Sequence, residues 1–151
     1  MRRTLNAADL STGDIEPAFA LIQALHPSLT LETWQAFATQ LVDQRPSAQR
    51  GLIGVRNETG YICGLFVYRA EADLMHERAF AVDVIAAIDI VDASVVIREM
   101  MKAARATARR LGCGIIRVRV DRNQPALAHF LGESGLEIEG QVLRTPKLEA
   151  V

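Results

Sequence analysis

The sequence has few lysines and few cysteines. Lys102 and Lys147 are its only lysines, although arginine is common. Cys63 and Cys113 lie far apart, in no CxxC motif and in no cluster of potential ligands. This pattern excludes the common zinc-binding motifs and gives no indication of a disulfide framework. We therefore expect no metal site, and two reduced thiols in the core.

Long apolar runs are also missing. After Arg2 and Arg3, three polar residues (Asn6, Asp9 and Asp14) interrupt any secretory leader. No stretch approaches the ~20 apolar residues that cross a bilayer. The net charge of −1 gives no overall attraction to nucleic acid or to a membrane surface. We expect a cytoplasmic protein of bacterial type, folded as one domain over residues 1–151, because a length of 151 residues suits a single core.

Hydrophobic periodicity divides the chain into helices and strands. Helices are expected at 14–25, 28–44, 92–111 and 124–134. Within 2–10 a strand is expected to run into a turn at Asn6–Asp9, and further strands are expected at 51–56, 61–71, 79–88, 114–123 and 136–148. The order predicts an α/β (α+β) protein, with a mixed, mostly antiparallel sheet of about six strands and helices on both faces.

Glycine is absent between Ala79 and Gly112, a stretch that includes the junction of strand 79–88 with the long helix. Helix N-termini at such junctions often bind phosphate, because their free N–H groups and dipole attract anions. Asp92 is expected to cap this helix, and each of Asp89 and Asp92 would repel a phosphate by a few kcal/mol at roughly 4 Å. Two interpretations stay open. The junction is either a capped helix start without a ligand or an unusual phosphate site to which Ser94 contributes a hydroxyl.

The second half of the chain resembles the GNAT acetyltransferase superfamily. Residues 108–140 run as a helix end, Gly112-Cys113, a strand, Asn123, a short helix, Gly135-Leu136 and a further strand. The element order matches the family over nearly the whole chain. The resemblance implies acetyl-CoA as co-substrate, and direct acetyl transfer to an amine of a small molecule or protein.

The resemblance also implies a coenzyme site. Backbone N–H groups around residues 88–90 would polarise the thioester carbonyl, residues 94–96 would meet the pyrophosphate, and Asn123 would lie near the pantetheine arm. The chain departs from the family here, since positions 92–97 carry none of the glycine-rich signature of its pyrophosphate loop. The residues implied for coenzyme binding are Ile88, Asp89, Ile90, Ser94, Val95, Val96, Asn123 and Phe130.

Two side chains are candidates for proton transfer. Asp83 is the lone charge in strand 79–88, and a carboxyl group among apolar neighbours can act as a general base near neutral pH. The alternative is that Asp83 faces solvent or pairs with Arg117 or Arg119. The family's acidic tyrosine falls at Leu131 by spacing, so the neighbouring His129 is the candidate replacement, with a surface or capping role as the alternative.

A stripe of basic residues follows one side of the long helix: Arg98, Lys102, Arg105 and Arg109. It either meets the phosphates of coenzyme A or is the solvated face of the helix. The first functional hypothesis is a GNAT-like N-acetyltransferase. The alternative is a GNAT-like domain without catalysis that senses a ligand or binds proteins, as a possible homodimer. The net charge disfavours nucleic-acid binding.

Overall fold

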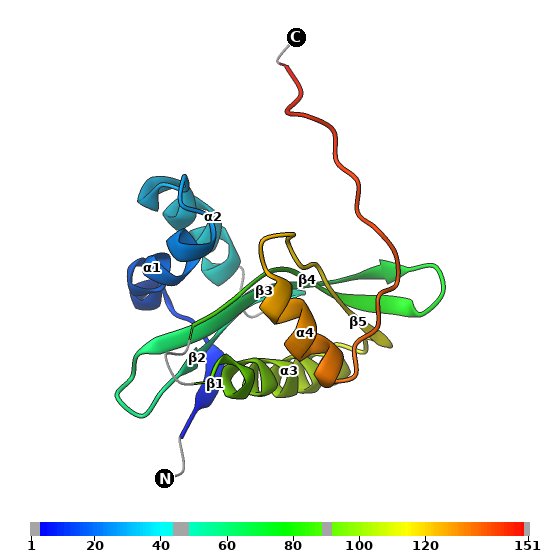
Figure 1. Ribbon diagram of the computed structural model, residues 1–151, viewed down its shortest axis with the longest axis horizontal. Helices are drawn as coiled ribbons and strands as arrows, with labels where there is room; N and C mark the ends of the chain where they lie inside the picture. Colours follow the sequence, from blue (N-terminus) through cyan, green and yellow to red (C-terminus); the bar gives the residue numbers. More distant parts are fainter. Residues whose placement is uncertain (1–3, 44–48, 89–91, 150–151) are drawn as a thin grey trace.

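One sheet of five strands forms the centre of the molecule (Figure 1). The computed structural model describes residues 4–43, 49–88 and 92–149. The strands follow the chain order β1-β2-β3-β4-β5, and all neighbours are antiparallel except β4 and β5, which are parallel. Their bounds are β1 (Asn6–Asp9), β2 (Arg50–Arg56), β3 (Ile62–Asp73), β4 (Glu77–Ala87) and β5 (Ile115–Val118).

Helices cover both faces of the sheet, as predicted. The helices are α1 (Ile15–Leu25) and α2 (Leu31–Asp43), preceded by a short turn η1 (Thr12–Asp14), and α3 (Ala93–Arg110) and α4 (Pro125–Glu133). Residues of α1 and α2 share one core cluster with the sheet, and residues of α3 and α4 share the other. The sheet therefore separates two cores.

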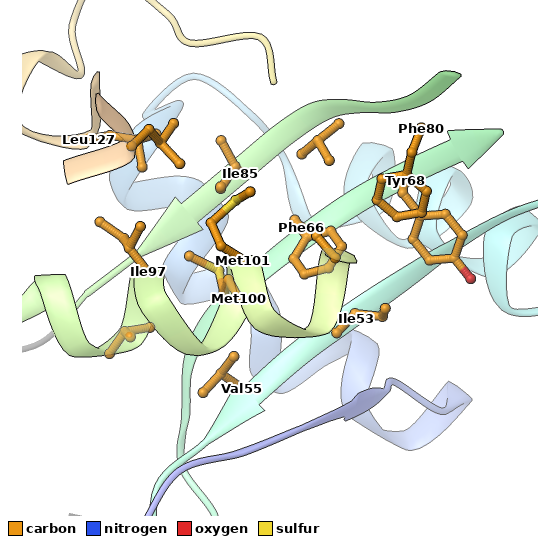
Figure 2. Packing of buried hydrophobic residues seen from close by; sticks show 14 of the residues in the cluster. Ile53, Val55, Phe66, Tyr68, Phe80, Ile85, Ile97, Met100, Met101 and Leu127 are labelled. Carbon is orange, nitrogen blue, oxygen red and sulfur yellow. The ribbon is translucent and has the colours of Figure 1, made fainter. Parts of the chain in front are cut away.

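The core beneath α3 and α4 is shown in Figure 2. Phe66 of β3 lies beside Met100 and Met101 of α3, Phe80 of β4 stacks on Tyr68, and Leu127 of α4 belongs to the same cluster. Each side chain of this size contributes ~1.5–3 kcal/mol when it is fully buried. In the other core, the indole N–H of Trp34 donates to the Ile15 carbonyl oxygen (2.7 Å), which joins α2 to α1.

The sequence of α3 sets both its ends and its buried side. Asp92 caps the helix by accepting a hydrogen bond from the Ser94 N–H (3.0 Å). Gly112 ends it in the left-handed region, at φ 73°. The buried residues repeat at helical spacing: Val96, Ile97, Met100, Met101, Ala104, Thr107 and Ala108.

β4 contains one extra residue relative to β3. Val67 pairs with Val84 and Tyr68 pairs with Val82, so Asp83 between them is a β-bulge. Bulges bend a strand and end regular pairing, and they are common beside active sites. The pairing of β4 with β5 also stops here: its last pair is Val82 with Val118.

Two sequence predictions are wrong. The turn expected at Asn6–Asp9 is strand β1, because these residues pair with β2, and the predicted sixth strand is absent. Residues 136–148 contain no strand, and β5 is shorter than the strand expected at 114–123. Leu136 packs on the core beneath α4, but the chain then runs away from the body to the C-terminus (Figure 1). Residues 136–148 therefore pair with none of the described strands, although their sequence has strand periodicity.

Candidate functional site

The sheet opens between β4 and β5 beyond the bulge. The Arg119 N–H still donates to the Val82 carbonyl oxygen (2.8 Å), after which the chain leaves β4 towards α4. The side-chain amide of Gln124 donates to the Ile85 carbonyl oxygen (3.2 Å) from this open side. Residues two apart in a strand present their backbone groups to the same edge. The N–H groups of Ile85 and Ala87 therefore also point into the opening.

An apolar cavity of about 230 Å³ lies at the end of this opening. Four elements supply its wall: the C-terminal end of α1, the last residues of β4 with Ile88, the start of α3, and α4. The wall comprises Leu21, Ala24, Leu25, Ala86, Ala87, Ile88, Ala93, Ile97, Gln124, Ala126, Leu127 and Phe130. None of these described residues is ionisable, so the cavity suits a narrow and mainly apolar group.

The loop 121–124 joins the two sides of the cavity. The side-chain amide of Asn123 donates to the Leu25 carbonyl oxygen (3.5 Å) at the end of α1. Beside this contact, the Nε2 atom of His26 lies 3.8 Å from a carboxylate oxygen of Asp121. Gln124 reaches across to β4 from the same loop. His26 directly follows the wall residue Leu25, and Asp121 precedes the wall residue Gln124 by three positions, but neither side chain lines the cavity itself.

Asp83 does not face the cavity wall. It forms an ion pair with Arg69 of β3, and the Nε atom of Arg69 also donates to Glu71 (2.9 Å). The ion-pair interpretation of Asp83 was therefore right in kind, but its partner is Arg69 and neither Arg117 nor Arg119. A guanidinium on the carboxylate leaves it poorly suited to take a proton from a substrate.

His129 lies on the outer side of α4. Its Nε2 atom is 3.1 Å from Glu133, four residues along the same helix, and two thirds of its side chain is exposed. The alternative of a surface role therefore describes it better than a role as general acid. Its neighbour Phe130 lines the cavity, whereas Leu131, the position to which spacing assigned the family's tyrosine, is buried in the core.

The side chain of Asp92 occupies the N-terminus of α3. The Ser94 hydroxyl and N–H both donate to one carboxylate oxygen of Asp92 (2.5 and 3.0 Å). Val96 is fully buried against β3: a Cβ on Gly64 would lie 2.6 Å from its Cγ1 atom. Val96 therefore belongs to the core and has no surface for a phosphate, and Val95 beside it is half-buried.

The residues implied for carbonyl polarisation divide into two groups. The Ile88 N–H donates to the Cys63 carbonyl oxygen on β3 (2.8 Å), so it is not available to a ligand, although Ile88 lines the cavity. Asp89 and Ile90 lie outside the described residues. The amide of Ala87, one residue earlier, has the orientation that the resemblance requires.

One residue of the basic stripe on α3 holds another helix in place. Arg105 is half-buried and donates to the Ser134 carbonyl oxygen (2.8 Å), which holds the C-terminal end of α4. Arg98, Lys102 and Arg109 are exposed. In the described ranges no three His, Cys, Asp or Glu side chains gather as a metal site, and no helix there is long and apolar enough to cross a membrane.

Sequence reasoning missed the His26–Asp121 pair and the role of Gln124. His26 directly follows the last residue of α1, and no sequence motif marks it. Asn123 and Leu25, beside the pair, are 98 positions apart in the chain, and no periodicity or spacing signals such a contact. A polar cluster at a predicted strand-to-helix loop, Asp121 to Gln124, was the one available hint.

Comparison with known proteins gives structural matches. No family model and no curated protein sequence matches the chain. An aminoglycoside N-acetyltransferase in complex with CoA superposes with a TM-score of 0.82 at 11% identity, covering 97% of both chains. An aminoglycoside 6'-N-acetyltransferase from Acinetobacter baumannii gives 0.79 at 13% identity, covering 97% of this chain and 100% of its own. The chain has the GNAT fold.

The same GNAT fold occurs in a transcriptional regulator from Bacillus halodurans, which matches with a TM-score of 0.78 at 14% identity and covers 95% of this chain and 100% of its own. The resemblance found in the second half of the sequence is confirmed at the level of fold. Within the GNAT fold of this chain, the opening beyond the bulge and the apolar cavity form one continuous candidate site.

Proposed function

We propose that this protein is an N-acyltransferase that moves an acetyl group from acetyl-CoA to an amine of a small molecule or protein. The observation that carries the proposal is the apolar cavity at the open end of β4, where backbone N–H groups face the opening. Its volume of about 230 Å³ lies below the ~300–1,000 Å³ of whole-ligand pockets. It therefore suits the slender pantetheine arm and leaves the nucleotide outside. A GNAT-fold neighbour that was solved with CoA supports this assignment.

The residues present fit the arm better than the phosphates. Apolar side chains such as Leu127 and Phe130 suit the methylene-rich arm, whereas Asp92 places a carboxylate at the helix N-terminus. We place the phosphates further along α3, towards the exposed Arg98 and Lys102. Acetyl-CoA would supply the activated acetyl group and a thiolate leaving group.

The reaction requires a group that polarises the thioester carbonyl and a base that removes a proton from the amine. The N–H of Ala87 is the donor that we assign to the developing oxyanion, because it points into the opening. The amine nitrogen attacks the carbonyl carbon, the C–S bond breaks, and the electron pair leaves on sulfur. The amine proton must go to a base, and the thiolate takes up a proton from solvent.

His26 is the base that we assign. The described wall of the cavity is not ionisable, and His26 directly follows the wall residue Leu25. The Asp121 carboxylate, 3.8 Å from its Nε2 atom, favours one orientation of the ring. This is the arrangement in which a third group orients a general base.

Filling the cavity tests the proposal directly. Ala126 of α4 lines the cavity, whereas Ala128, two residues later on the same helix, is exposed and outside it. In Ala126→Trp the indole should occupy the space for the arm, so calorimetry should show at least a tenfold loss of CoA affinity, about 1.4 kcal/mol.

Ala128→Trp is the matched control and should bind CoA as the unmodified protein does. Equal binding by both variants would move the coenzyme away from this cavity. If the unmodified protein does not bind CoA at millimolar concentration, the acyltransferase proposal is wrong and the non-catalytic module is the better assignment.

The role of His26 is tested by the pH dependence of kcat. Removing a positioned general base typically costs 10²–10⁴-fold in rate, so His26→Gln should lower kcat by about that factor and leave KM for acetyl-CoA nearly unchanged. The rate of the variant should then rise with pH up to the pKa of the acceptor amine.

His129→Gln is the control, because that histidine is exposed on the outer side of α4. It should retain the rate and the pH profile of the unmodified enzyme. A His26→Gln enzyme with an unchanged profile would assign the proton to another acceptor.

A further inference from the structure

Arg119 places a guanidinium beside the opening between β4 and β5. It directly follows β5, and its backbone N–H donates to the Val82 carbonyl oxygen where the two strands separate (2.8 Å). The residue is exposed, and its side chain forms no hydrogen bond or ion pair within residues 4–43, 49–88 and 92–149. Because a guanidinium keeps its charge at physiological pH, a full positive charge is available at this place.

The side chain of Arg119 points to the face of the sheet on which α1 lies. Its neighbours Val118 and Val120 pack on the core beneath α3 and α4, and successive side chains of an extended chain alternate between the two faces. Asp121, two positions later, lies 3.8 Å from His26 at the end of α1. Arg119 is therefore on the same side of the opening as the base that we assign.

Two other arginines on this face are already neutralised. Arg69 of β3 forms ion pairs with two carboxylates, and Arg117 of β5 forms ion pairs with two others. Arg117 shares the face with Arg119 because the two are two positions apart, and Arg69 shares it because Val67, two positions earlier, packs in the core beneath α1. Arg119 is the member of this group without a carboxylate among the described residues. The free positive charge of the group therefore lies next to the opening, where an acceptor must enter.

We propose that the acceptor amine carries a carboxylate and that Arg119 binds this carboxylate; the proposal rests on the acyl transfer proposed above. A guanidinium presents a fork of N–H donors that matches a carboxylate in both geometry and charge. The same guanidinium repels an ammonium group, so a polyamine should be a poor acceptor. The substrate class is thus an aminocarboxylate.

The distance along β4 indicates which amine of such a molecule reacts. Arg119 lies level with Val82, whereas the oxyanion donor that we assign, Ala87, is five positions further along the strand. This separation is up to ~16 Å at ~3.3 Å per residue, and an extended arginine side chain covers only part of it. The amino group and the carboxylate must therefore be several bonds apart, as in an ω-amino acid and not in an α-amino acid.

Three acceptors of matched length test the recognition of charge. The compound 6-aminohexanoate ends in a carboxylate, 6-aminohexanamide in a neutral amide and 1,6-diaminohexane in a second amine. Thiol release from acetyl-CoA gives kcat/KM for each with the full-length protein. We expect the carboxylate to exceed the amide about tenfold or more, because hydrogen bonds between charged groups are the strong ones, and the diamine to be the poorest of the three. Free glycine, a short α-amino acid, should react more slowly than 6-aminohexanoate.

Substitutions of Arg119 test whether this residue reads the charge. Arg119→Gln should bring the kcat/KM ratio of carboxylate to amide close to one, mainly by raising KM for the carboxylate. Arg119→Glu should reverse the order and favour the diamine. Arg110→Gln is the matched control, because it removes an exposed arginine at the C-terminal end of α3, and it should keep the ratio of the unmodified protein.

The outcomes separate this inference from the proposed function. Equal kcat/KM for carboxylate and amide in the unmodified protein, or a preference that Arg119→Gln retains, would overturn the assignment of Arg119 and leave the acyl transfer itself intact. No thiol release with any of these acceptors would also overturn it, and the affinity for CoA would then decide whether the proposed function fails as well.

Discussion

At the scale of single residues, Asp92 combines a stabilising and an inhibiting effect. Its carboxylate accepts the Ser94 N–H (3.0 Å) and thereby stabilises the start of α3. The same carboxylate places a negative charge where a pyrophosphate would meet the helix dipole. The cap is a hydrogen bond and the repulsion is a charge, so substitutions can separate the two effects.

Asp92→Asn should keep the cap and remove the charge. We expect an unfolding free energy close to that of the unmodified protein and CoA binding at least tenfold tighter, because a charge at roughly 4 Å costs a few kcal/mol. Asp92→Ala should bind CoA with a similar gain but lose ~1 kcal/mol of stability with its cap. Urea denaturation and calorimetry measure the two quantities. Unchanged affinity in both variants would show that the phosphates do not approach this helix end.

At the scale of elements, Arg117 ties three segments together. From β5 it forms ion pairs with Asp73 at the end of β3 (2.5 Å) and with Glu139 in the segment that follows α4 (2.8 Å). The hydrogen bonds from Arg117 lower the pKa of the Asp73 and Glu139 carboxyl groups, and these partners raise the pKa of Arg117. A carboxyl group whose pKa is lowered by folding stabilises the fold above its unfolded pKa, and this stability is lost as the pH falls through the folded pKa.

The contribution of Arg117 should therefore depend on pH. At pH 6 both carboxyl groups are ionised in either state, so Arg117→Gln should unfold at a lower urea concentration than the unmodified protein. This difference should begin to shrink below the unfolded pKa values of ~4 and be lost as the pH falls through the lower pKa values of the folded state. Arg144→Gln is the control, because Arg144 donates to the carbonyl oxygen of its neighbour Thr145 and to no described carboxylate. A difference that stays constant from pH 6 to pH 3 would assign the effect to packing of the Arg117 side chain.

At the scale of the whole molecule, local pattern predicted most of the fold and little of the site. The buried side of α3 follows from helical spacing, and the β2–β3 hairpin follows from the turn at Asn57, because both depend on neighbouring residues. The partner of Asp83 and the approach of His26 to Asp121 depend on register and on helix docking, which no local pattern encodes. The predicted strand 136–148 was wrong because periodicity is local, whereas a strand also needs pairing with a neighbour, and residues 136–148 pair with none of the described strands.

The bulge in β4 has a consequence for how this protein tolerates genetic change. The divergence of β4 from β5 depends on the number of residues between Val82 and Val84, and only secondarily on the chemistry of the one that stands there. Substitutions of Asp83 should therefore leave the opening between β4 and β5 in place. In-frame loss of its codon should restore continuous pairing of β4, extend its pairing with β5, and close the opening in which we place the acyl donor.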